Sequence, residues 1–234
     1  MSERCVHPEG IDVLRHTLNF ETDVTAVFDG ATTDGSPRSK LTTIFLGLAH
    51  EHWLSLRVLM AEGLSHSAIG LLRLQFEATL KGFWVHFAAA DPWIEKAGVI
   101  REVNDQLVEP DLPNVGEMLK DVERTAPPKA FALLDQFKSV AWRQLNSYVH
   151  GGMHALANFG GEFPAAFLVQ IVANANGVYS LAATLAASLS NDPQRVQLAI
   201  ASQFAHPECL PPFTNNPYLN FDLGRPSPTP DNAD

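Results

Sequence analysis

The longest uncharged run in this chain lies between Glu162 and Asp192 and reads FPAAFLVQIVANANGVYSLAATLAASLSN. It exceeds the roughly 20 residues that a helix needs to cross a bilayer. Polar residues interrupt it at Gln170, Asn174, Asn176, Ser180 and Thr184, and Gly177 lies near its middle. A lipid-facing helix tolerates such interruptions poorly. The run therefore predicts a central helix buried inside a helical domain, with a membrane span as the alternative.

The composition limits both the size of the fold and the class of partner. The 234 residues are enough for one domain, and only 18% of them are charged, against about 25% in average soluble domains. The formal net charge of −10 argues against a protein that coats nucleic acid, but it allows an enzyme that holds RNA at one local site. Cys5 and Cys209 give neither a disulfide framework nor a zinc spacing, which indicates a cytoplasmic protein.

Helical periodicity and helix caps run through nearly the whole chain, and no convincing strand pattern is present. Ser36 and Pro37 form a cap-and-proline start, as do Asp91 and Pro92. We expect helices at about 11–28, 37–60, 65–89, 91–107, from 114, at 127–149, from 164, and at 192–204. These ranges predict an all-α, single-domain helical bundle.

The composition changes at Pro207, because seven of the 16 prolines lie in the last 28 residues. Such a segment buries too little apolar surface to form a core. We therefore divide the chain into a helical domain at 1–206 and a proline-rich tail at 207–234, disordered or laid over the surface.

The most informative segment is WRQLNSYVHGG at 142–152. Arg143 and His150 are seven residues apart, almost two helical turns, and Asn146 lies three residues after Arg143. The three side chains therefore share one stripe of the helix. We expect Gly151 and Gly152 to end this helix with a left-handed cap.

This stripe combines groups that suit phosphate chemistry. Histidine exchanges protons near neutral pH, and arginine binds a phosphate through two parallel donors. Asn146 can hold a ribose or orient the imidazole. Together the groups can activate an RNA 2′-hydroxyl without a metal, and a symmetric dimer would supply the second acid or base. The structural alternative is that Arg143 pairs with a carboxylate, His150 stabilises the helix end, and Asn146 is a satisfied buried amide.

The segment resembles the Arg-x(4–6)-His motif of the HEPN superfamily, with Arg143 and His150 at the longest spacing that the motif allows. The SYVHGG ending, together with the earlier LLRLQFEATLKGFW helix, is similar to an uncharacterised bacterial branch of HEPN-like proteins. The resemblance covers about residues 36–190. It implies a four-helix core with extra helices, and Asn146 takes the place of the polar residue that accompanies the arginine.

The resemblance implies two kinds of function. Active HEPN proteins are dimeric, metal-independent endoribonucleases of toxin–antitoxin and phage-defence systems, and this gives Arg143, Asn146 and His150 a catalytic role. Other members have lost catalysis and bind nucleotides or proteins, which would make this chain a regulatory module or antitoxin. A homodimer, an RNA substrate and an antitoxin or other protein partner are the expected partners, without a membrane.

A second polar stripe lies on the helix expected at 65–89, where Arg73 and Glu77 are four residues apart. Glu77 can serve as counter-ion for Arg143 or orient His150, and the alternative is an intrahelical pair between Arg73 and Glu77. Gly70 on the same face predicts close helix packing.

The histidines do not predict a metal site. His150 and His154 have the spacing of two ligands on one helix, but Gly151 and Gly152 lie between them, so His154 is only a supporting residue. His50 and His52 point about 200° apart on their helix. No glycine-rich phosphate loop or nucleophile elbow is present, and we expect neither a metal nor another cofactor.

Overall fold

Helix α8 (Ala165–Ser188) occupies the middle of the bundle, as the uncharged run predicts. It packs against α1 (Pro8–Ala26), α2 (Pro37–Ala61), α3 (Ser65–Phe87) and α9 (Pro193–Ala205). The seven residues from Asn174 to Ser180 are all buried, so the helix has core on every side at its centre. It is the one described helix long and apolar enough to cross a membrane, but its central packing is that of the core helix of a folded bundle.

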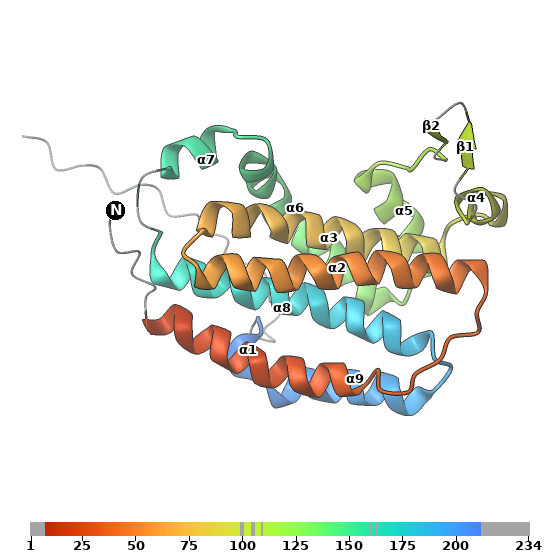
Figure 1. Ribbon diagram of the computed structural model, residues 1–234, viewed down its shortest axis with the longest axis horizontal. Coiled ribbons are helices and arrows are strands. Elements are labelled where there is room, and N and C mark those ends of the chain that lie inside the picture. Colours follow the sequence, from red (N-terminus) through yellow and green to blue (C-terminus); the bar gives the residue numbers. More distant parts are fainter. Residues whose placement is uncertain are drawn as a thin grey trace, which may run out of the picture.

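The computed structural model describes residues 8–98, 101–103, 106–108, 110–159, 161 and 163–211. The remaining elements are α4 (Asp91–Ala97), β1 (Arg101–Val103), β2 (Gln106–Val108), α5 (Val115–Thr125), α6 (Pro128–Val149), α7 (Met153–Asn158) and the 3₁₀ turn η1 (Pro207–Cys209). In Figure 1 the α2–α3 hairpin crosses the middle, α8 lies below it, α1 and α9 lie at the bottom, and α5, α6 and α7 lie above. The all-α bundle is confirmed.

Several predicted helix ends are present as hydrogen-bonded caps. The Ser36 hydroxyl accepts a hydrogen bond from the Ser39 backbone N–H at 3.2 Å, with Pro37 in the first turn. Asn114 and Glu117 form a reciprocal capping box at the start of α5. These side chains satisfy backbone N–H groups that have no partner inside the helix, which is why the sequence marked these starts reliably.

The helix expected at 91–107 is wrong beyond its first two turns. Helix α4 ends at Ala97, and β1 and β2 then form an antiparallel hairpin with Arg101 opposite Val108. Strands of three residues are too short for alternation to be visible in the sequence. Helix α7 is an addition to the predicted helices, because the two glycines end α6 but a new helix begins directly after them, at Met153.

The folded domain continues past the predicted boundary at 206. Residues 207–211 pack onto the bundle, where Cys209 is fully buried and Leu210 is nearly so. The rest of the predicted tail, from 212, lies outside the described residues.

A buried hydrogen-bond network centred on Asn176 of α8 joins three helices and η1. The Asn176 Oδ1 accepts from Trp53 Nε1 of α2 at 2.8 Å. Its Nδ2 donates to Thr17 Oγ1 of α1 at 2.8 Å and to the Cys209 carbonyl at 2.7 Å. Both polar atoms of this amide are thus satisfied, by partners on three different elements. The network therefore fixes the register of these elements against α8.

Of the two glycines of α3, Gly82 rather than Gly70 lies tightly against a neighbouring helix. A Cβ at Gly82 would lie 2.8 Å from Leu46 Cδ2 and 3.3 Å from Leu46 Cγ. A Cβ at Gly70 would meet only Val149 Cγ2, at an ordinary 3.8 Å. The close packing expected at Gly70 is therefore wrong, and at Gly82 any larger residue would have to displace the Leu46 side chain.

We predict that Asn176→Ala lowers the free energy of unfolding by about 3 kcal/mol, because it leaves the Trp53 indole N–H and the Cys209 carbonyl buried without partners. Asn174→Ala is the matched control on the same helix, since the Asn174 Nδ2 is buried with no partner to lose. We expect Asn174→Ala to lower the free energy of unfolding by only about 1 kcal/mol. Urea unfolding at equilibrium measures both, and equal losses would contradict the assigned role of the network.

The two glycines of α3 should respond differently to alanine. Gly70→Ala should raise the free energy of unfolding by up to about 1 kcal/mol, because alanine is the better helix former and has room. Gly82→Ala should be less stable than Gly70→Ala by about 2 kcal/mol, because the new methyl group displaces the Leu46 side chain. Thermal or urea unfolding checks the order, and a reversed order would show that the contact is not tight.

Candidate functional site

The C-terminal end of α6 is fixed by a glycine turn. Gly151 has φ +64°, the left-handed conformation that glycine adopts without strain, and the Gly152 N–H donates to the Ser147 carbonyl at 2.7 Å. This is the cap that the two glycines predict. A Cβ at Gly152 would lie 2.7 Å from Ser147 Oγ, so the chain passes too close to α6 for any other residue. The turn follows His150, the C-cap residue directly after the last helical residue Val149, and leads into α7.

Arg143 and His150 are both exposed on α6. Six other arginines have described side chains, and each of them forms an ion pair with a carboxylate: Arg15 with Asp12, Arg38 with Asp91, Arg57 with Glu21, Arg73 with Glu77, Arg124 with Asp121, and Arg195 with Asp192. No carboxylate among the described residues pairs with Arg143. The expectation that this arginine sits in a structural ion pair is therefore not met within the described chain.

Asn146 differs from its two neighbours on the stripe. It is half-buried, and its Oδ1 is buried without a hydrogen-bond partner. Its backbone carbonyl accepts from the His150 N–H at 3.0 Å as part of the helix end. No hydrogen bond between the Asn146 side chain and the His150 imidazole is present in the described chain. The satisfied buried amide that the sequence left as an alternative is thus not observed either.

His154 lies on α7 and is exposed. Its backbone N–H donates to Ser147 Oγ at 2.9 Å, which fastens the start of α7 to the last turn of α6. The glycine turn therefore brings His150 and His154 to the same end of the bundle, on different helices, as the predicted break between them requires.

Arg73 and Glu77 form the intrahelical ion pair that the sequence left open, with 2.6 Å between Nη2 and Oε1. The Arg73 guanidinium also lies over the Trp142 ring of α6, 4.5 Å from its centroid. No described contact joins Glu77 to Arg143 or His150. The pair thus ties α3 to α6 beside the stripe, since a guanidinium over an indole face is attracted by the ring.

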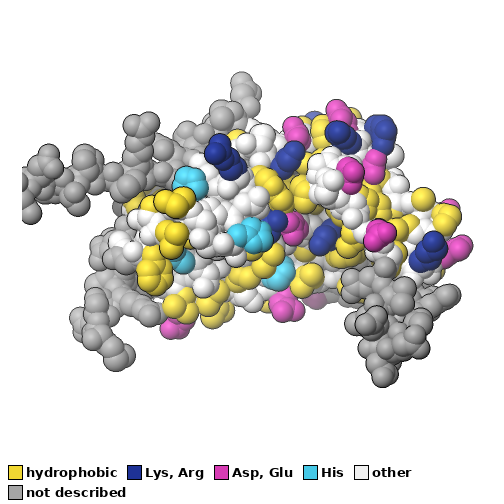
Figure 2. Space-filling view, turned by 90° about the horizontal axis from the view of Figure 1, so that it is seen from above, with side chains coloured by type: hydrophobic (Ala, Val, Ile, Leu, Met, Phe, Trp, Pro, Cys, Tyr) yellow, Lys and Arg dark blue, Asp and Glu magenta, His cyan; other side chains and the backbone are white. Residues whose placement is uncertain are grey.

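Helix α7 presents an apolar patch beside His150, which we call the α7 patch. None of the six residues of this helix is buried, and Met153, Leu156 and Phe159 are 76%, 62% and 80% exposed. Figure 2 looks down on this face and shows hydrophobic side chains gathered at the left, where α7 lies in Figure 1. Basic and acidic side chains are interspersed elsewhere on the face, so it carries no continuous basic field.

His66 at the start of α3 lies behind the α7 patch. Its ring contacts Tyr148, Phe159 and Phe163, with centroid distances between 4.8 and 5.9 Å. Burial lowers the pKa of His66, and backbone contacts from α7 oppose the shift. This histidine is thus a neutral packing residue under α7 at pH 7 and is not a second charged group for the stripe.

One cavity lies elsewhere, between α1, α2 and α8, and has a volume of about 460 Å³. His50 and Tyr179 line it. The sequence does not reveal this cavity, because residues between 25 and 189 of the chain form its walls, and it offers His50 only as a possible metal ligand.

No three His, Cys, Asp or Glu side chains among the described residues gather as a metal site would require.

Comparison with known proteins gives one match, a family model described as a family of unknown function, DUF6988, over residues 46–212. No curated protein and no solved structure matches significantly. The matched range contains the whole α6–α7 stripe together with Arg73 and Glu77. Because the model matches more than half of the chain, the protein belongs to the DUF6988 family.

Proposed function

We propose that this protein is a HEPN-like, metal-independent endoribonuclease of a cytoplasmic toxin–antitoxin or phage-defence type, with Arg143 and His150 at the cleft of a homodimer. The observation that carries the proposal is the free Arg143 guanidinium. A cation that the fold leaves exposed and without a carboxylate among the described residues is available for a phosphate, to which it can donate two parallel hydrogen bonds.

In the proposed cleavage of RNA, the two acting side chains are His150 and Arg143, whose positions are about 10 Å apart along the helix axis. The His150 imidazole removes the proton from an RNA 2′-hydroxyl, and the 2′-oxygen attacks the adjacent phosphorus. Arg143 stabilises the negative charge that develops on the non-bridging oxygens. The 5′-oxygen leaves and takes a proton from a second acid, and the products are a 2′,3′-cyclic phosphate and a free 5′-hydroxyl.

A second copy of the chain supplies that acid in this proposal. The described face around His150 offers no orienting carboxylate, so one copy alone lacks half of the acid–base pair. The α7 patch beside His150 gives two copies an apolar surface through which to associate, and large exposed apolar residues of this kind are typical of interaction sites. The net charge of −10 limits RNA contact to this local site.

A non-catalytic binding module, such as an antitoxin, is the second candidate. The same α7 patch favours it, because its apolar side chains suit a protein partner better than RNA. The missing hydrogen bond between Asn146 and His150 also favours it, since a general base is normally oriented by a neighbouring group. In this case Arg143 and His150 would contact the partner and no RNA would be cut.

We predict that the purified protein cleaves RNA in the presence of EDTA, and that His150→Ala lowers the cleavage rate by about a hundredfold or more, because general acid–base catalysis contributes about 10² to 10⁴. Arg143→Ala should lower it by a similar factor through the lost charge stabilisation. The matched control is Lys129→Ala, which removes an exposed cation from the first turn of the same helix. Gel analysis of a labelled RNA gives the rates.

Full activity of His150→Ala would reject the assigned catalytic role, and cleavage that EDTA abolishes would reject metal independence. If no RNA is cut at high protein concentration, the binding module is favoured. That module predicts a stoichiometric protein complex that Leu156→Asp on the α7 patch weakens, while Leu198→Asp, an equally exposed leucine on α9, leaves it intact.

A further inference from the structure

The cavity between α1, α2 and α8 is separate from the stripe formed by Arg143, Asn146 and His150, which we call the α6 stripe. The walls of the cavity are mainly apolar. Its lining residues are Thr25, Phe28, Ala31, Thr33, Thr43, Leu46, Gly47, His50, Tyr179, Ala182, Ala183, Ala186 and Leu189. None of them carries a permanent charge. A volume of about 460 Å³ falls within the range of small-molecule sites, which are mainly apolar with a few polar groups that fix the orientation of the ligand.

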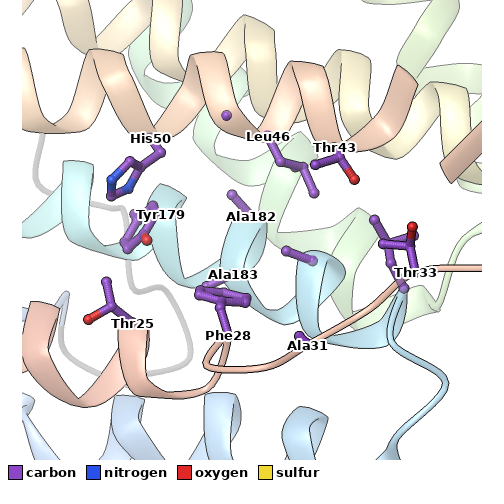
Figure 3. A pocket seen from close by; sticks show the side chains of 13 residues that line it. Thr25, Phe28, Ala31, Thr33, Thr43, Leu46, His50, Tyr179, Ala182 and Ala183 are labelled. Atoms are coloured by element: carbon purple, nitrogen blue, oxygen red, sulfur yellow. The ribbon is translucent and has the colours of Figure 1, made fainter. Parts of the chain in front are cut away.

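The polar groups gather at one end of the cavity. Figure 3 shows His50 directed from α2 toward Tyr179 of α8, with Thr25 of α1 nearby, while Phe28, Ala182 and Ala183 form an apolar middle. The His50 and Tyr179 ring centroids are 5.2 Å apart. Tyr179 stacks on Trp53 at 3.9 Å, and this holds its ring in place.

Neither side chain at this polar end has its hydrogen-bonding capacity satisfied within the described residues. The His50 Nδ1 is buried without a partner. The other ring nitrogen and the Tyr179 hydroxyl form no hydrogen bond within the described residues, and they are not among the buried unpaired atoms, so both remain accessible. Thr25 differs, because its hydroxyl donates to the Glu21 carbonyl at 2.7 Å. The accessible ring nitrogen and hydroxyl, rather than the enclosed Nδ1, are the groups that a ligand in the cavity can meet.

The charge state of His50 favours an uncharged ligand. Burial lowers the pKa of this imidazole, a shift that Glu21 opposes and Arg57 assists. Glu21 and Arg57 are paired with each other at 2.7 Å and are absent from the cavity lining. A neutral imidazole in a wall without cations gives no counter-charge to an anionic ligand.

Gly47, in the middle of α2, is one of the residues that line the cavity. A Cβ at this position would meet nothing within 4 Å, so close helix packing does not require glycine here. Glycine inside a helix lowers its stability, and the position has no packing contact to compensate for this. A large side chain at this position would therefore enter space that the cavity now occupies.

We propose that this cavity binds a small, uncharged and largely apolar molecule that carries one hydroxyl or phenol group, with His50 as the hydrogen-bonding residue. The apolar body lies against the Phe28, Ala182 and Ala183 surface, and the polar group meets the imidazole. This function is independent of RNA cleavage, since the cavity shares no residue with the α6 stripe.

The test uses the full chain and three probes of one shape: 4-propylphenol, propylbenzene and 4-propylbenzoate. Ligand-observed NMR and calorimetry should give saturable binding for 4-propylphenol, weaker binding for propylbenzene, and none for the anionic benzoate. His50→Phe should lower the affinity for 4-propylphenol by about twofold to tenfold, which is the effect of losing one hydrogen bond. The same change should leave the affinity for propylbenzene unaltered.

A matched pair at Gly47 tests the location of the site. Gly47→Ala should bind 4-propylphenol as the wild type does, and Gly47→Phe should weaken it by at least about tenfold by filling the cavity. Thr43→Trp fills the same space from the rim if Gly47→Phe does not fold. Absence of saturable binding, equal binding by the blocked variants, or binding of the benzoate as tight as that of the phenol would overturn the proposal.

Discussion

The arrangement of the bundle depends on one buried amide. Asn176 sits in the most enclosed part of α8, and its hydrogen bonds reach Trp53 on α2, Thr17 on α1 and the Cys209 carbonyl of η1. An apolar side chain at this position would leave buried groups on two other elements unsatisfied, so the helices can meet in only one register. This constraint also positions Tyr179, one turn further along α8, against Trp53 at the wall of the cavity.

The helix that carries Arg143, Asn146 and His150 is anchored separately, on α3. The Arg73–Glu77 pair and the cation–π contact to Trp142 hold α6 on α3, and the glycine turn at Gly151 sets the direction of α7. Arg73 and Glu77 thus have a structural role in these contacts, whereas Arg143 and His150 are exposed to solvent. The two arginines therefore differ in their surroundings: Arg73 is half of a partly buried ion pair, and Arg143 is exposed without a carboxylate partner among the described residues.

The sequence predicted features that depend on local chemistry. Caps at Ser36 and Asn114, the glycine turn after His150 and the buried uncharged helix all rest on interactions within a few residues or on composition. The α4 boundary, the close contact at Gly82, the continuation of the domain to Pro211 and the cavity rest on contacts between distant segments. For the stripe, spacing placed Arg143, Asn146 and His150 on one helix, but it could not reveal that Asn146 turns partly inward or that Glu77 is already paired with Arg73.

We propose that Arg143 and His150 of two copies form one site. A crystal structure of the protein in its solution oligomeric state, with the distance between the two His150 imidazoles as the readout, tests it most directly. We expect a two-fold axis beside α7, with the two histidines and the two Arg143 side chains facing one cleft that admits a single phosphodiester. A monomer in solution, or a dimer whose two stripes lie on remote faces, would contradict it.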